Sequence, residues 1–186
     1  MTVTFSASGT ASAGGVQQSY ALALTALLEG QLSDIRDNTI GTYINETDAV
    51  LAYGNVVVFN SAGTVANSAK TISSASDIVQ GVNVLTYVDE KAVDANSRPG
   101  VNEEQVLNVA NEGAVAVFVH GSVTPATVVR VIHTVSGVQY PGQFRSAALS
   151  GKTAVLANAR YLTSVTGSGL AIVELNGPSF TLTADT

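Results

Sequence analysis

Cysteine and tryptophan are both absent from this 186-residue chain, and charged residues make up only 12% of it. The absence of cysteine excludes disulfide bonds and thiolate chemistry. The charged fraction is about half of the ~25% that is usual for soluble domains. A surface with so few charges favours two interpretations. One is extensive contact with another protein, and the other is a well-packed β domain with Ser, Thr and Asn outside.

Basic residues are also few, and the net charge is −6. Lys and Arg are scattered singly, so no basic stripe is available to neutralise nucleic-acid phosphates. No apolar run approaches the ~20 residues that span a bilayer. The first residues, MTVTFSASGTASAGG, lack the basic start and apolar core of a secretory signal. We therefore expect no nucleic-acid partner and no membrane, and the lack of cysteine favours assembly in the cytoplasm.

The composition of the sequence changes at Gly30, from small residues to runs rich in β-branched and aromatic residues. Residues 1–15 are almost entirely Ser, Gly, Ala and Thr, which cannot form a core alone. Residues 16–28, VQQSYALALTALL, fit either a helix, because Ala and Leu favour one, or an extended segment packed on a partner. We predict an N-terminal arm over residues 1–29 and a β head domain over residues 30–186.

Short runs rich in Val, Ile, Thr, Tyr and Phe predict strands throughout the head. They cover residues 39–44, 55–59, 78–88, 105–110, 114–120, 127–135, 159–163, 170–175 and 180–183. Gly, Asn, Ser and Pro separate them, and NEG at 111–113 is interpreted as one of the turns. Strands joined by tight turns without intervening helices indicate a mainly β fold, an antiparallel β-barrel or sandwich head.

The C-terminal hairpin over residues 159–175 is predicted to supply core strands. Because side chains alternate along a strand, LAIVEL places Ala171, Val173 and Leu175 on one wholly apolar face. We assign that face to the core, and Glu174 marks the opposite face as partly wet.

The stretch LSGKTAVL at 149–156 resembles the end of a phosphate-binding loop. Such a loop needs a Gly five positions before the Gly-Lys pair, followed by a helix. Ser146 stands at that position, and the residues downstream have a β texture. We therefore interpret this stretch as a turn with a solvated Lys152 and expect no nucleotide binding.

Other polar residues do not form a catalytic or metal-binding pattern, so we predict no catalytic residues, no metal ligands and no cofactor. TGSGLA at 166–171 fits a hairpin turn, and His120 and His133 are interpreted as surface or interface residues. The interval 88–105 is predicted to be a solvated loop. Its acidic residues could converge but lack a calcium-loop pattern; they are Asp89, Glu90, Asp94, Glu103 and Glu104.

The segment VLANARYLTSVTGSGLAIVELNG at 155–177 resembles the closing segment of phage structural cement proteins, which decorate the capsids of tailed phages. That family ends with an Ala-Arg-aromatic-Leu-Thr-Ser run, here residues 159–164, then a Gly-rich turn and a Leu-Ala-Ile-Val-Glu-Leu strand. Upstream, YGNVVVFNSAG, GVNV and EQVLNVANEGAVAVFV follow a similar order. Ala126 stands where the family usually has Gly, and the resemblance covers roughly residues 30–177.

This resemblance implies a cement protein on the outer surface of a virion, assembled in the host cytoplasm. It implies binding that bridges major capsid proteins and stabilises the shell, and a homo-oligomer, with a trimer favoured over a dimer. The chain is then not an enzyme. An alternative is a glycan-binding adhesion module, for which only Tyr140 and Phe144 lie in an obvious loop. A polysaccharide hydrolase or lyase would need paired carboxylates with aromatic platforms, which we do not find.

Overall fold

The computed structural model describes residues 27–33, 38–85, 92–94 and 96–185. Most of the predicted arm, and residues 16–26 of the candidate helix, lie outside the described residues; Leu27 and Leu28 are not helical. The described chain forms thirteen strands: β1 (Thr39–Asn45), β2 (Leu51–Ala52), β3 (Val56–Phe59), β4 (Ser68–Thr71), β5 (Val79–Asn83), β6 (Gly100–Val101), β7 (Val106–His120), β8 (Arg130–Ile132), β9 (Phe144–Arg145), β10 (Thr153–Leu156), β11 (Ala159–Tyr161), β12 (Gly169–Asn176) and β13 (Leu182–Ala184).

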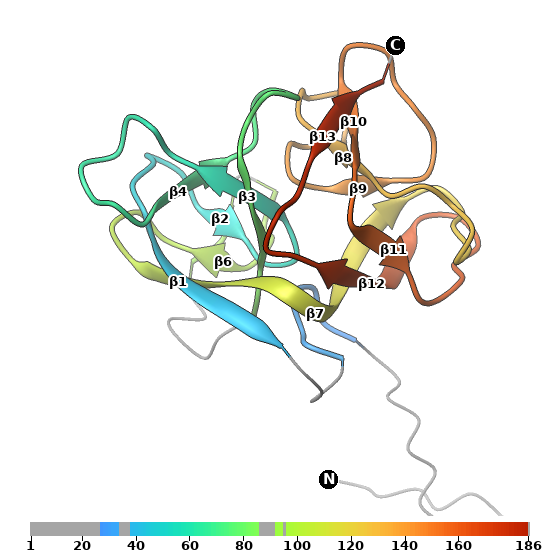
Figure 1. Ribbon diagram of the computed structural model, residues 1–186, viewed down its shortest axis with the longest axis horizontal. Coiled ribbons are helices and arrows are strands. Elements are labelled where there is room, and N and C mark those ends of the chain that lie inside the picture. The colour runs from blue at the N-terminus through green and yellow to red at the C-terminus, as the bar shows by residue number, and fades with distance from the viewer. Residues whose placement is uncertain (1–26, 34–37, 86–91, 95, 186) are drawn as a thin grey trace, which may run out of the picture.

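The N-terminal lobe is a small β-barrel. Its strands pair in the order β1, β4, β3, β5 and β7, and β7 pairs back onto β1 to close the ring. The two-stranded sheet of β2 and β6 is separate from the main sheet. Figure 1 shows this lobe on the left, with β1 and β4 toward its outer side.

The C-terminal lobe is built around the second half of β7. On one side β7 pairs with β12, which pairs with β11. On the other side the order continues through β9, β8, β10 and β13. Only the turn at Ala157 and Asn158 separates β10 from β11, so the chain itself connects the end strand β11 to β10, the neighbour of the other end strand β13. The mainly β fold and the barrel predicted from the sequence are confirmed.

The strand β7 is shared by both lobes and runs along the base of the molecule in Figure 1. The prediction of a turn at 111–113 is wrong, because these residues continue the strand. Gly113 has a φ of 119°, and a Cβ there would lie 1.9 Å from Oδ1 of Asn38. A glycine is therefore needed at this position because β7 lies close to the chain before β1. The register of the β1–β7 pair also shifts nearby, between Thr39 and Ile40.

Two apolar clusters fill the molecule. One lies within the barrel and includes Val57, Leu107 and Val109, whereas Val56 and Val58 belong to a larger cluster shared with the C-terminal lobe. The strand β3 is therefore buried on both faces, which explains its uninterrupted run of valines.

The core face of the C-terminal hairpin was predicted correctly. Ala171, Val173 and Leu175 are each at most 1% exposed, and Glu174 lies on the partly exposed face.

Several predicted strands differ in extent from those observed. The run at 78–88 forms a strand only over β5, and residues 86–88 lie outside the described part. The run at 127–135 contributes only β8. The short strands β2, β4, β6, β9 and β10 were not among the predicted runs. The pairing is mostly antiparallel, but β1 with β4 and β7 with β9 are parallel over two residue pairs each.

Candidate functional site

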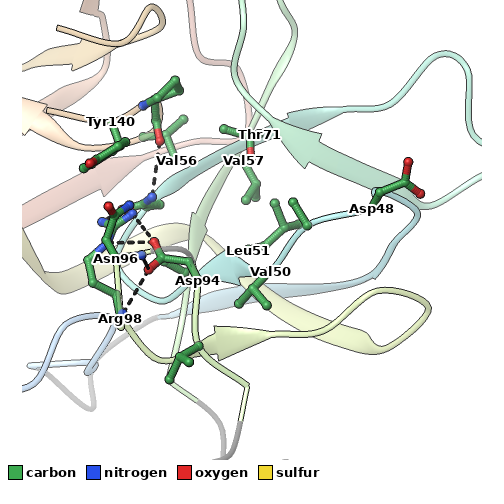
Figure 2. A pocket seen from close by; sticks show the side chains of 15 residues that line it. Asp48, Val50, Leu51, Val56, Val57, Thr71, Asp94, Asn96, Arg98 and Tyr140 are labelled. Carbon is green, nitrogen blue, oxygen red and sulfur yellow. Dashed lines mark hydrogen bonds and ion pairs between the residues drawn. The ribbon is translucent and has the colours of Figure 1, made fainter. Parts of the chain in front are cut away.

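A groove opens beside the N-terminal barrel, next to the loop that precedes β9. Its volume is about 380 Å³. Its walls come from residues 48–52, the start of β3, Thr71, Val93, Asp94, Asn96 and Arg98, and Tyr140 with Pro141. Figure 2 shows Val50 and Leu51 along one stretch of the groove, with Arg98, Asp94 and Tyr140 gathered at its other end. The groove thus has an apolar stretch and a polar end.

The polar end is held by an ion pair between neighbouring turns of one loop. Nη2 of Arg98 lies 2.7 Å from Oδ2 of Asp94, and Nη1 of Arg98 donates to Oδ1 of Asn55 at 3.1 Å. Burial opposes ionisation of Asp94, but backbone N–H groups of Arg98 and Asn96, together with the guanidinium, outweigh it and lower its pKa. Because the two charges neutralise each other, this end of the groove favours a neutral ligand surface over a free anion or cation.

Glu29 lies close enough to this ion pair for the charges of both Arg98 and Asp94 to affect its pKa. Burial raises the pKa of Glu29, the Arg98 charge opposes that rise and the Asp94 charge adds to it. The described chain therefore begins beside the polar end of the groove.

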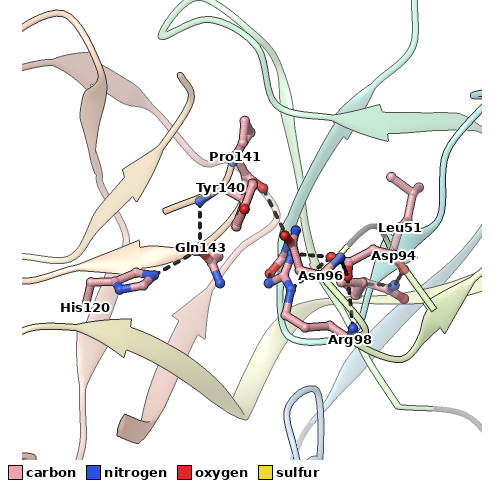
Figure 3. A network of polar contacts seen from close by, with 11 residues as sticks. Leu51, Asp94, Asn96, Arg98, His120, Tyr140, Pro141 and Gln143 are labelled. Carbon is pink, nitrogen blue, oxygen red and sulfur yellow. Dashed lines mark hydrogen bonds and ion pairs between the residues drawn. The ribbon is translucent and has the colours of Figure 1, made fainter. Parts of the chain in front are cut away.

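A polar seam joins the groove to the C-terminal lobe. Nδ2 of Asn55 donates to the carbonyl oxygen of Pro141 at 3.3 Å, and the N–H of Val56 donates to that of Gly142 at 2.9 Å. Oε1 of Gln143 accepts from the N–H of Tyr140 at 2.8 Å and lies 2.9 Å from Nε2 of His120. Figure 3 shows these contacts running from His120 across to Arg98 and Asp94. The seam fixes one lobe against the other.

The residues singled out in the sequence are not brought together in one site. Lys152 follows a turn that begins at Leu149, and the strand β10 follows it instead of a helix. Lys152 is half-buried, which corrects the prediction that it is solvated, and its Nζ donates to Oγ of Ser136 at 3.3 Å. His133 lies elsewhere, with Nδ1 3.0 Å from Oγ1 of Thr134. His120 is half-buried in the seam.

The acidic residues of the 88–105 interval also take different places. Asp94 lies in the groove, Glu103 and Glu104 are exposed, and Asp89 and Glu90 lie outside the described residues. Among the residues that the structure describes, no group of three His, Cys, Asp or Glu side chains is placed to hold a metal ion.

Exposed apolar side chains are a feature that the sequence analysis missed. Val138, in the tight turn of residues 136–139 of the C-terminal lobe, is 77% exposed, and Ile78, just before β5, is 66% exposed. A single exposed valine or isoleucine is ordinary. These two stand out because they lie on different lobes that share one strand.

Comparison with known proteins assigns the chain to a family. A family model described as "Structural cement protein (E217 gp24/Pam3 gp6)" matches residues 16–176. The chain belongs to this cement family. It is a capsid-stabilising structural protein of the phage virion, as the resemblance of its C-terminal segment implied.

The fold of this cement protein is similar to that of a solved phage structure. A chain from a structure titled "The capsid of Myoviridae Phage XM1" superposes with a TM-score of 0.60 at 17% sequence identity, covering 90% of this chain and 98% of that one. No curated protein matches the sequence. The described part of the chain consists of strands and loops and contains no helix that could cross a membrane.

Proposed function

We propose that this cement protein binds the outer surface of the capsid and bridges neighbouring major capsid proteins without catalysing a reaction. The observation that carries this proposal is the presence of exposed apolar side chains on both lobes of one continuous β framework. Val138 and Ile78 would each enter an apolar depression on a different capsid subunit.

Bridging requires that the two contacts keep a fixed spacing. The shared strand β7 is 15 residues long, or about 50 Å at ~3.3 Å per residue. The seam hydrogen bonds from Asn55 and Val56 tie the lobes together next to this strand. Two lobes held at a fixed spacing present both contacts at once. The second binding event is then intramolecular, and avidity rises by ~10²–10⁴.

The low charge of the surface supports contacts that depend little on salt. Only 12% of the residues are charged, and two of them, Arg98 and Asp94, already pair with each other. Binding through apolar contacts is screened much less than binding through exposed charges. The protein would also associate with itself, as a trimer or a dimer, so that copies reinforce one another on the lattice.

The glycan-binding alternative loses one of its two aromatic candidates. Phe144 is fully buried in the core cluster, so its ring cannot stack on a sugar. Tyr140 remains partly exposed, but Arg98 lies 6.0 Å from its ring centroid.

Co-sedimentation with expanded capsids, proheads and free capsid subunits tests the proposal. We expect Val138→Asp and Ile78→Asp each to weaken binding to expanded shells by ~10²–10⁴, because each removes one of two linked contacts. Thr166→Asp, an exposed change in the Gly-rich turn, is the matched control and should bind like the wild type. Equal binding to free subunits, strong loss in moderate salt, or full binding of both apolar variants would contradict the proposal.

A further inference from the structure

The ring of the N-terminal barrel is incompletely closed at β1. Six residues of β1 pair with β7, but only Ile44 and Asn45 pair with β4 on the other side. The segment Ile40–Thr42 therefore forms an edge of the sheet. In Figure 1 this part of β1 lies at the lower margin of the barrel.

The direction of the backbone groups along β1 follows from the register. The N–H of Asn45 donates to Gln105 of the β7 side, and the N–H of Ile44 donates to Asn67 of the β4 side. Because hydrogen-bonding direction alternates along an antiparallel pair, the N–H and C=O groups of Ile40 and Thr42 point away from β7. Within the described part of the chain no group bonds to them.

This edge lacks two of the usual protections against pairing, charge and proline, and its one irregularity is the register shift between Thr39 and Ile40 at its start. Natural edges carry charged residues, proline or bulges that turn them away from other strands. The sequence of residues 38–45, NTIGTYIN, has no charge and no proline. Ile40 is 43% exposed, and Val106 on the adjacent strand is 49% exposed, so the edge also has an apolar flank.

A suitable strand is present in the part of the chain outside the structure. Residues 1–26 contain no Asp, Glu, Lys, Arg or Pro, and Thr2–Ser6 read TVTFS, with Val3 and Phe5 on one face if extended. These 26 residues could span up to ~85 Å when extended. A strand added along β1 would gain backbone hydrogen bonds to Ile40 and Thr42, and Val3 with Phe5 would cover the apolar flank.

The point where the described chain begins favours a second copy as the source of this strand. Gly30 and Ser33 hydrogen bond to Ala116 and Ala114, so the entering chain lies along the second half of β7. The open edge lies opposite Asn108 and Ala110, in the first half. The described chain therefore begins beside the second half of β7 and runs toward β1, so it starts on the far side of the open edge.

We propose that the open edge of β1 binds residues 2–6 of a second copy of this chain as an added strand. This proposal rests on the self-association part of the proposed function and not on capsid bridging. Its test uses the free protein without capsids, so its failure would leave bridging untouched. The recognition chemistry is strand addition, in which main-chain hydrogen bonds give affinity and alternate side chains give specificity.

Cysteine cross-linking can detect this contact without background, because the chain has no cysteine of its own. Single-cysteine variants at positions 2 to 6 are each mixed with Thr42→Cys under mild oxidation. We expect a covalent mixed dimer from at least one of these positions, formed at least about tenfold faster than with Ala184→Cys on the edge strand β13. Absence of mixed dimers at all five positions would overturn the proposal. So would a double variant that forms its disulfide only within one chain.

Sedimentation of proline variants tests the same contact without cross-links. The outward N–H of Thr42 is dispensable to the β1–β7 ladder, so Thr42→Pro removes the backbone donor offered to an added strand, together with the hydroxyl that donates to Oδ1 of Asn108 at 3.4 Å. The register of β10 with β13 also leaves the N–H of Ala184 pointing outward, which makes Ala184→Pro the matched control. We expect Thr42→Pro, and deletion of residues 1–15, to weaken self-association at least about tenfold, and Ala184→Pro to leave it unchanged. Self-association that survives either change, or a wild type that stays monomeric, would overturn the proposal.

Discussion

Two buried asparagines in the N-terminal barrel and one buried tyrosine in the C-terminal lobe differ in their hydrogen bonding. In the N-terminal barrel, Nδ2 of the fully buried Asn83 donates to the carbonyl oxygens of Leu51 and Ala52 at 2.8 and 3.2 Å. Asn45 likewise donates to Ala49 and Val101 at 2.8 and 3.0 Å. In the C-terminal lobe, the buried hydroxyl of Tyr161 has no partner among the described residues.

This difference follows from the regularity of each lobe. The barrel must satisfy the backbone of short, irregular segments such as β2 and β6, and two asparagines act in place of a longer ladder. The C-terminal lobe has the eight-residue pairing of β7 with β12, so the backbone of these two strands is satisfied mainly by the ladder between them. In the barrel, two amide side chains therefore stabilise short segments, whereas the core face of the long strand β12 is wholly apolar.

The largest expected effect concerns two glycines with positive φ, one in each lobe. A Cβ at Gly81 (φ 145°) would lie 2.1 Å from the carbonyl oxygen of Ala110, whereas a Cβ at Gly137 (φ 62°) would meet nothing within 4 Å. We expect Gly81→Ala to destabilise the protein by at least about 4 kcal/mol, because β5 would separate from β7. Gly137→Ala should cost only about 1–2 kcal/mol of backbone strain. Urea denaturation measures both, and equal costs would show that the barrel tolerates separation of these strands.

The next effect tests apolar packing in the C-terminal lobe. Leu175 is 1% exposed on the core face of β12, and we expect Leu175→Ala to lower the free energy of unfolding by about 2–5 kcal/mol. The exposed Leu162 provides the control, since Leu162→Ala should stay within about 0.5 kcal/mol of the wild type. A cost for Leu175→Ala as small as that of the control would reverse the assignment of the core face.

A third effect compares the polar groups directly. Asn83→Ala leaves two buried carbonyl groups without their donor, and we expect a loss of about 1–3 kcal/mol. Tyr161→Phe removes a buried hydroxyl that has no described partner, so the stability should stay within about 0.5 kcal/mol of the wild type or rise. Chemical denaturation of both variants decides the matter. A large loss in Tyr161→Phe would reveal that its hydroxyl is satisfied and would remove the contrast between the lobes.

The smallest effect is a local pH dependence in the barrel. The side chains of Thr64 and Ser68, and the N–H groups of Val65 and Thr64, hold the pKa of Glu46 below its usual range. Because the folded-state pKa is the lower one, the carboxylate stabilises the 60–67 loop above the unfolded pKa. That contribution is lost as the pH falls through the folded pKa.

We therefore expect amide exchange at Thr64 and Val65 to accelerate on acidification in the wild type. In Glu46→Gln it should already be fast at neutral pH, with little further change. The exposed Asp48→Asn is the control and should behave like the wild type. Hydrogen exchange followed by NMR measures this, and identical pH profiles for wild type and Glu46→Gln would show that the loop does not depend on the carboxylate.

How far the sequence predicted the structure differs between the two lobes for a physical reason. The core face of β12 was predicted because β12 is a long, regular strand. Every second side chain in it is apolar, and these are the side chains that are buried. The strand β4, SAKT, has no such alternation. It is a strand because it pairs with β3, and that pairing is a tertiary contact that the local sequence pattern does not indicate. Glycine also misled the prediction at Gly113, where it serves a close contact inside a strand rather than a turn.

The groove and the seam were beyond the reach of sequence patterns. Asn55, Arg98 and Tyr140 are far apart in the chain, and none of them stands in a recognisable sequence motif. Only the packing of the lobes brings them together. Phe144 was expected in a loop because Pro141 and Gly142 precede it, yet it begins β9 and is buried. The family resemblance, by contrast, came from the C-terminal run, whose residue order is specific.

The shared strand β7 also determines how the molecule responds to mechanical tension. If the lobes are attached to two capsid subunits that are pushed apart, the tension runs along the covalent backbone of β7. The eight residue pairs between β7 and β12 are then loaded in shear, all at the same time, instead of being unzipped one after another. Two lobes joined by a flexible linker would stretch before they resisted, whereas a common strand transmits the tension from the first ångström of displacement.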